Sequence, residues 1–118
     1  MLRLQAYLTE DRALALGDVL GTLRYMAPER LEGWSDRRSD IYSVGTLLYQ
    51  LTTGRMPFNG ETEYQILNQI VNDDVPPPST IVPDYPPALT AIVMKALQRD
   101  PEKRYRTALE LQTAVEDF

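Results

Sequence analysis

The chain has 118 residues, of which 43% are hydrophobic and 25% are charged, and its formal net charge is −5. This composition is typical of one globular domain; it provides no clustered basic patch for nucleic acid, and no run of about 18 apolar residues is present to span a membrane. Because cysteine and histidine are absent, disulfides, thiolate nucleophiles, histidine bases and the usual zinc sites are excluded, and the lack of cysteine fits a cytoplasmic location.

The first part of the chain gives weak structural signals. Residues 1–16 show no sustained periodicity, so we expect a poorly ordered arm there and a single domain over residues 17–118. A short helix is expected over residues 27–31, because Pro28 suits a first helical position and Gly33 suits a stop.

The clearest helix is SDIYSVGTLLYQLTTG, with Ser39 as its expected N-cap and Gly54 as its C-terminal stop. Between positions 41 and 51, Gln50 is the only strongly polar side chain. A helix that is apolar all round is normally buried on every side. This helix is therefore predicted to be the centre of the fold.

Three further helices are predicted after it. Thr62 and Thr107 each stand three residues before a Gln or Glu, which predicts a capping box at the start of two of them. The proline-rich stretch DDVPPPSTIVPDYPP is predicted to be extended and not helical, and RDPEKRYR to be a turn-rich loop. The predicted core faces are Ile66, Leu67, Ile70 and Val71, then Leu89, Ile92, Val93, Ala96 and Leu97, then Ala108, Leu111, Val115 and Phe118. The fold class is mainly α.

Four motifs follow one another along the chain: GTLRYMAPE, SDIYSVG, GRMPF and RDPEKR. In this order and approximate spacing they resemble the later half of a eukaryotic-type serine/threonine protein kinase domain, most closely in its bacterial branch. The resemblance covers residues 17–118. It implies an incomplete kinase C-lobe, in which residues 1–16 are the remnant of the activation segment, and a family activity of ATP-dependent phosphorylation of protein serine and threonine hydroxyls.

The resemblance assigns a substrate-side role to the loop before the Ala-Pro-Glu helix. Thr22 would hydrogen-bond the catalytic aspartate and lysine of the family. Together with Thr22, the residues Leu20, Gly21, Leu23 and Tyr25 would line the pocket for the residue after the phosphorylated hydroxyl. The alternatives are an ordinary turn residue at Thr22 and simple loop packing for the other four.

Three charged residues resemble structural residues of the family. Glu29 and Arg104 would form an ion pair that joins the Ala-Pro-Glu helix to the loop before the last helix; the alternative is two solvated charges. Asp40 would accept backbone N–H bonds from the catalytic loop, and the alternative is a first-turn acid favoured by the helix dipole.

The motifs that bind nucleotide and perform phosphoryl transfer are missing from this sequence. It contains no glycine-rich loop, Val-Ala-Ile-Lys lysine, His-Arg-Asp loop or Asp-Phe-Gly motif. The complete family domain would use ATP and Mg²⁺, whereas this chain alone is expected to bind no cofactor or metal and to be inactive. Of the upstream positions, Leu14 and Leu16 stand where related sequences usually carry threonines, and only Thr9 remains, so activation by phosphorylation here is in doubt.

The sequence is therefore interpreted as a fragment of a cytoplasmic serine/threonine kinase, whose partners would be a protein substrate or the missing N-terminal portion of the kinase. Two alternatives stay open. One is a non-catalytic interaction module that uses the helix led by Tyr64, and the other is an unrelated helical binding domain.

The fragment interpretation makes a prediction about the central helix. In the family, segments before the activation segment cover part of it, so here one side is expected to be poorly covered and Asp40 to lack its backbone donors. Complete burial of Tyr42, Leu47, Leu48 and Tyr49 would instead indicate a complete domain.

Overall fold

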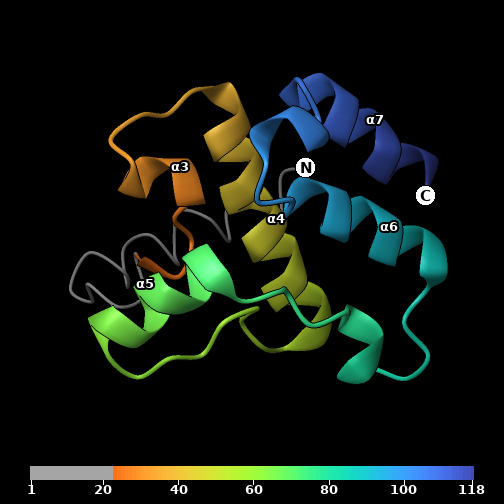
Figure 1. The fold of residues 1–118 in the computed structure, drawn as a ribbon. Helices are drawn as coiled ribbons and strands as arrows, with labels where there is room; N and C mark the ends of the chain where they lie inside the picture. Colours follow the sequence, from red (N-terminus) through yellow and green to blue (C-terminus); the bar gives the residue numbers. More distant parts are fainter. Residues whose placement is uncertain (1–22) are drawn as a thin grey trace.

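The structure is a computed structural model that describes residues 23–118. These residues form five α-helices and two short 3-10 helices, without a strand among them. The elements are α3 (Pro28–Leu31), α4 (Arg37–Thr53), α5 (Glu63–Asn72), η1 (Pro78–Thr80), α6 (Pro87–Ala96), η2 (Pro101–Lys103) and α7 (Ala108–Asp117). The long helix α4 runs through the middle, with α3 and α5 on one side and α6 and α7 on the other (Figure 1). The predicted mainly α fold is confirmed.

The start of α4 differs from the prediction, because Asp36 and not Ser39 is the N-cap. The Asp36 carboxylate accepts a hydrogen bond from the backbone N–H of Arg38 at 2.8 Å, and the Ser39 hydroxyl accepts one from the N–H of Asp36 at 3.2 Å. Asp36 and Ser39 thus form a capping box, in which Asp36 is the N-cap and Ser39, three residues later, accepts the reciprocal hydrogen bond. The C-terminal end is as predicted, with Gly54 in the left-handed conformation at φ 78°.

The two predicted threonine caps are present at α5 and α7. Thr62 accepts from the N–H of Gln65 and Thr107 from the N–H of Glu110, both at 3.1 Å. The reciprocal bonds, however, reach one residue further back than a capping box requires. Gln65 and Glu110 accept from the residues before the two caps, at 2.8 and 3.0 Å.

The core of the fold surrounds α4 unevenly. Tyr42, Leu47 and Tyr49 are almost fully buried, at 3%, 0% and 0% exposure. Leu48 is only half-buried, and Leu51 is 41% exposed. The four residues whose complete burial would indicate a complete domain are therefore not all buried, as the fragment interpretation expects. One stripe of the helix is less covered than the rest.

The contact between α4 and α6 is close because of a glycine. A Cβ atom added to Gly45 would lie 2.8 Å from the Cβ of Ala96 and 3.2 Å from a methyl group of Leu97. The two helices thus approach each other more closely than two larger residues would allow. Tyr42, Tyr49, Val93 and Leu97 pack together beside this contact.

The last helix buries a narrower face than the sequence predicts. Leu111 is buried and Ala114 packs beside it, but Ala108, Val115 and Phe118 are exposed. The reason is that α7 lies at the edge of the molecule and contacts α6 and α4 along one side only (Figure 1).

Two other expectations are corrected. Val71, on the predicted core face of α5, is 46% exposed. The proline-rich connection is not wholly extended, since Pro78 opens the 3-10 turn η1 and is itself buried. Within residues 23–118, no helix has the length and apolar character needed to cross a membrane.

Candidate functional site

The loop before α3 is anchored to the helices behind it. Leu23 is buried against Phe58, Ile66 and Ile70. The Tyr25 hydroxyl forms a hydrogen bond with the side chain of Gln50. The backbone carbonyl of Tyr25 accepts a hydrogen bond from the Ser43 hydroxyl at 2.7 Å. Both side chains thus hold the loop in place. The other three predicted residues of the substrate loop, Leu20, Gly21 and Thr22, lie outside the described residues, as do Thr9, Leu14 and Leu16 and the whole predicted arm 1–16.

Arg24, which no motif of the sequence singles out, ties the same loop to α5 through Gly60. Its Nη2 donates to the carbonyl of Gly60 at 3.0 Å, and the N–H of Gly60 donates to the side chain of Gln69 at 2.9 Å. A Cβ on Gly60 would lie 2.9 Å from the Cβ of Gln65, so the close approach requires glycine. No sequence signal marks this contact, because 36 residues separate Arg24 from Gly60.

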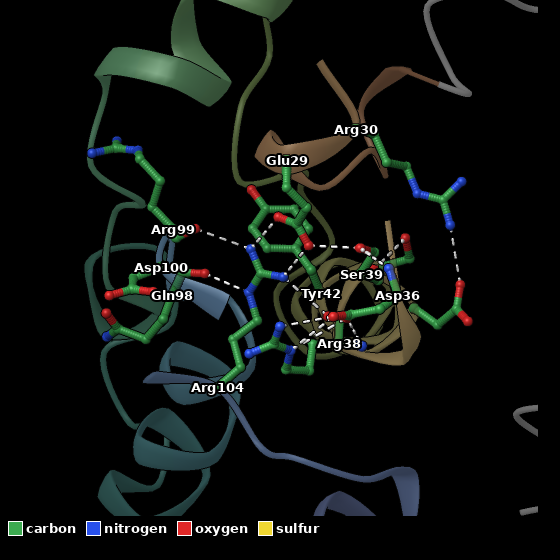
Figure 2. A network of polar contacts seen from close by, with 12 residues as sticks. Glu29, Arg30, Asp36, Arg38, Ser39, Tyr42, Gln98, Arg99, Asp100 and Arg104 are labelled. Atoms are coloured by element: carbon green, nitrogen blue, oxygen red, sulfur yellow. Dashed lines mark hydrogen bonds and ion pairs between the residues drawn. The ribbon is translucent and has the colours of Figure 1, made fainter. Parts of the chain in front are cut away.

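The structure brings Glu29 and Arg104 together across 75 residues of sequence (Figure 2). Two parallel bonds join them: Nη1 to Oε2 at 2.7 Å and Nη2 to Oε1 at 2.8 Å. Both residues are 3% exposed. The alternative of two solvated charges does not describe this geometry, which is that of a bidentate, buried ion pair.

The remaining donors of Arg104 are also satisfied. Its guanidinium donates to the carbonyl of Gln98 at 2.6 Å, of Arg38 at 3.0 Å and of Arg99 at 3.1 Å. The guanidinium also lies over the ring of Tyr42, 4.9 Å from its centroid. One side chain therefore joins α3, the first turn of α4 and the loop between α6 and η2 (Figure 2).

The carboxylate of Glu29 has a second partner in Ser39, whose hydroxyl donates to Oε2 at 2.6 Å. Burial by itself raises the pKa of this carboxyl, but the hydrogen bonds from Arg104 and Ser39 outweigh it and lower the pKa on balance. Burial raises the pKa of the neighbouring Tyr42 to about 12, while the charge of Arg104 acts in the opposite direction. Glu29 is thus held as an anion and Tyr42 as a neutral phenol.

Asp40 lies in the first turn of α4 and points to solvent, with a side chain that is 77% exposed. Its carboxylate contacts the Nη2 of Arg30 at 3.2 Å, and no backbone N–H among residues 23–118 donates to it. The position is compatible with a first-turn acid and leaves the carboxylate accessible to other donors.

Chemically, these groups form a clamp. The Arg104 guanidinium has no N–H left for a substrate, because its donors go to Glu29 and to three backbone carbonyls, and both carboxylate oxygens of Glu29 already accept hydrogen bonds. Within the described part of the chain, no three acidic side chains gather where a metal ion could be held. The arrangement fixes the loop that precedes α3 against the body of the fold.

Comparison with known proteins shows the family to which this chain is similar. A sequence model described as the protein kinase domain matches residues 5–115. The serine/threonine-protein kinase PknB of Mycolicibacterium smegmatis is 43% identical over 95 residues, which are 80% of this chain and 15% of that protein. A probable serine/threonine-protein kinase of Streptomyces coelicolor is 42% identical over 99 residues, which are 83% of this chain and 15% of that protein.

A solved structure shows the same relationship. The twitchin kinase region from C. elegans superimposes with a TM-score of 0.69 and 29% identity, over 80% of this chain and 16% of that one. This chain spans about 15% of the length of the curated relatives named above. The matched segment includes the Ala-Pro-Glu helix, the central helix and the three helices after it. The chain belongs to the protein kinase domain family.

Proposed function

We propose that this chain forms the substrate-side part of a serine/threonine protein kinase domain. The complete domain would transfer the γ-phosphoryl group of ATP to serine or threonine hydroxyls of a protein substrate. The observation that carries the proposal is the buried pair of Glu29 and Arg104, because it pins the end of the GTLRYMAPE loop to a scaffold that is distant in sequence. A loop that grips a substrate must hold its shape, since small displacements are costly in phosphoryl transfer.

In this proposal, residues 20–25 receive the substrate. Thr22 contacts the catalytic loop, and Leu20, Gly21, Leu23 and Tyr25 shape the pocket for the residue after the phosphorylated hydroxyl. The burial of Leu23 and the hydrogen bonds of Tyr25 to Gln50 and Ser43 support a rigid loop of this kind. The exposed carboxylate of Asp40 would accept backbone donors from a catalytic loop.

ATP and Mg²⁺ would be bound by the part of a kinase domain whose motifs this sequence does not contain. The chain alone would then bind neither and would not transfer phosphate. Its partners would be a protein substrate and a polypeptide that supplies the earlier portion of the domain, in the cytoplasm.

A chimera tests the proposal. Residues 17–118 would replace the matching segment of the M. smegmatis relative, and phosphorylation of a generic acceptor protein would be measured. We expect an active kinase, in which Thr22→Ala lowers kcat/KM about a hundredfold by misplacing the reacting groups. Thr113→Ala, at an exposed position of α7, is the matched control and should have no effect. A chimera that folds and binds ATP but does not phosphorylate would contradict the proposal.

The second candidate is a non-catalytic interaction module derived from a kinase. The observation that favours it is the exposed face of α5, where Tyr64 is 78% exposed and Val71 is 46% exposed. An inactive but folded chimera would favour this candidate, whereas an active one would make it unnecessary.

A further inference from the structure

An asparagine is followed directly by a glycine in the loop between α4 and α5, at Asn59 and Gly60. Asparagine is a thermally labile residue. The backbone nitrogen of a following glycine attacks its side-chain amide most readily, because glycine has no Cβ to hinder the approach. The other asparagines, Asn68 and Asn72, lie within α5 and are followed by residues that carry side chains. The sequence therefore favours such an attack at Asn59.

The two groups that would react are held differently in the fold. Asn59 is exposed, and its side chain forms no hydrogen bond among residues 23–118. Gly60 is buried, and its N–H donates to Oε1 of Gln69 at 2.9 Å. A hydrogen-bonded N–H gives up its proton less readily, and the bond also fixes the orientation of the peptide group. The amide that would be attacked is thus free, whereas the attacking nitrogen is restrained.

The same peptide group anchors the loop before α3. The carbonyl of Gly60 accepts from Nη2 of Arg24 at 3.0 Å, and a Cβ on Gly60 would lie 2.9 Å from the Cβ of Gln65. Gly60 is therefore closely enclosed by α5 on one side and bonded to Arg24 on the other. A hydrogen bond weakens steeply when its geometry is disturbed, so a change of backbone length at this position would break the contact with Arg24.

We propose that Asn59 is a site of spontaneous modification, which the hydrogen bond from Gly60 to Gln69 restrains. When local opening breaks that bond, the Gly60 nitrogen loses its proton to solvent and forms a bond to Cγ of Asn59. The side-chain nitrogen takes up a proton and leaves as ammonia, which closes a cyclic imide. Water then opens the ring. Cleavage of the bond from nitrogen to Cγ gives aspartate, and cleavage of the bond from nitrogen to the backbone carbonyl carbon gives isoaspartate.

The two products differ in their effect on the fold. Isoaspartate continues the backbone through its side chain, which inserts one methylene group before Gly60 and moves the Gly60 carbonyl away from Arg24. Aspartate keeps the original backbone and leaves the contact with Arg24 in place. The modification needs only water and does not depend on the proposed kinase function.

Incubation of the intact chain at neutral pH, followed by peptide mapping with mass spectrometry, tests the site. We expect conversion at Asn59 to both acids, with Asn68 and Asn72 unchanged. Amide hydrogen exchange measured on the same samples would show how often the bond from Gly60 to Gln69 opens.

Two glutamine variants test the restraint. Gln69→Leu should accelerate conversion about fivefold, the factor that the loss of one hydrogen bond allows, and should accelerate exchange of the Gly60 amide. Gln65→Leu is the matched control, because Gln65 accepts from the N–H of the next residue, Glu61, at 2.8 Å, and it should keep the original rate. If Gln69→Leu does not fold, the unchanged chain still tests the restraint: conversion and Gly60 exchange should accelerate together as urea is added.

The effect on Arg24 is tested with the separated isoaspartate form and with Asn59→Asp, which has the same charge and an unchanged backbone. In ¹⁵N-labelled protein, the amide signals of residues 23–25 should shift in the isoaspartate form and stay in place in Asn59→Asp. The proposal is wrong if Asn59 is converted no faster than Asn68 and Asn72, or if the two folded glutamine variants react at the same rate. Unshifted signals of residues 23–25 in the isoaspartate form would overturn the link to Arg24.

Discussion

Arg104 uses every N–H of its guanidinium inside the protein. Two bonds go to Glu29 and three go to backbone carbonyls, so its charge is fully compensated although it is removed from water. A buried pair of this kind is weak evidence for net stability, because desolvation offsets much of the attraction. Its value lies in what happens when one partner is removed, since the other then remains buried and uncompensated.

We therefore predict that Arg104→Ala lowers the free energy of unfolding by about 3–5 kcal/mol. Urea unfolding followed by circular dichroism measures this. Arg30→Ala is the matched control, because Arg30 pairs with the exposed Asp40 and should cost less than about 1 kcal/mol. Equal losses in the two variants would contradict the prediction. Arg104→Lys should recover only part of the loss, since an ammonium group cannot form two parallel bonds.

Glu29 also predicts a pH dependence. Its pKa is lower in the folded chain than the ordinary value of 4.5, so the unfolded state binds the proton more readily. The contribution of Glu29 to stability is therefore complete above pH 4.5 and is lost as the pH falls through the lowered pKa of the folded state. Urea unfolding between pH 3 and pH 7 should show a smaller decrease on the acid side for Glu29→Gln than for the unchanged chain. If the stability of the two proteins decreases equally with falling pH, Glu29 is not the source of the acid-side loss.

At the scale of the helices, sequence and structure agree where a signal is local. Helix ends lie at Thr62, Thr107 and Gly54 as predicted, because capping depends only on the residue itself and on backbone groups a few positions away. Asp36 and Ser39 are both good caps three residues apart, so local sequence alone does not decide between them. The choice is linked to Glu29, with which the Ser39 hydroxyl also forms a bond.

Other features of the fold and the site depend on distant parts of the chain. Which side of α7 is buried depends on where α6 and α4 lie, and the apolar pattern around Val115 contains no such information. The partnership of Glu29 with Arg104 was suggested by family resemblance and not by spacing. The place of Tyr42 beside Arg104 could not be predicted from the sequence, because a tyrosine in an apolar helix is expected simply to be a core residue.

The close contact between α4 and α6 gives a prediction at this scale. Gly45→Ala should destabilise the chain by about 1–3 kcal/mol through overpacking against Ala96, although alanine favours a helix by up to about 1 kcal/mol. The midpoint of urea unfolding measures the net effect. Adding Ala96→Gly removes the nearest atom and should relieve part of the strain. A Gly45→Ala variant as stable as the original would show that the helices can separate at little cost.

In the molecule as a whole, the leucines of α4 differ in burial according to the side of the helix on which they lie. Leu47 is fully buried, whereas Leu51 is 41% exposed and Leu48 is half-buried. In the proposed kinase domain, an earlier portion of the polypeptide would cover this stripe. In the isolated chain, the exposed apolar surface would promote self-association.

Substitutions of the buried Leu47 and of the exposed Leu51 test whether the two leucines differ in their contribution to stability. Leu47→Ala should lower the free energy of unfolding by about 2–5 kcal/mol, because it leaves a cavity in the core. Leu51→Lys should change it by less than about 0.5 kcal/mol, since a surface position loses little packing. The same variant should reduce self-association in sedimentation velocity, because a charge interrupts the apolar stripe. If Leu51→Lys instead unfolds the chain, the stripe is part of a core that this chain completes by itself, and no covering partner is needed to explain it.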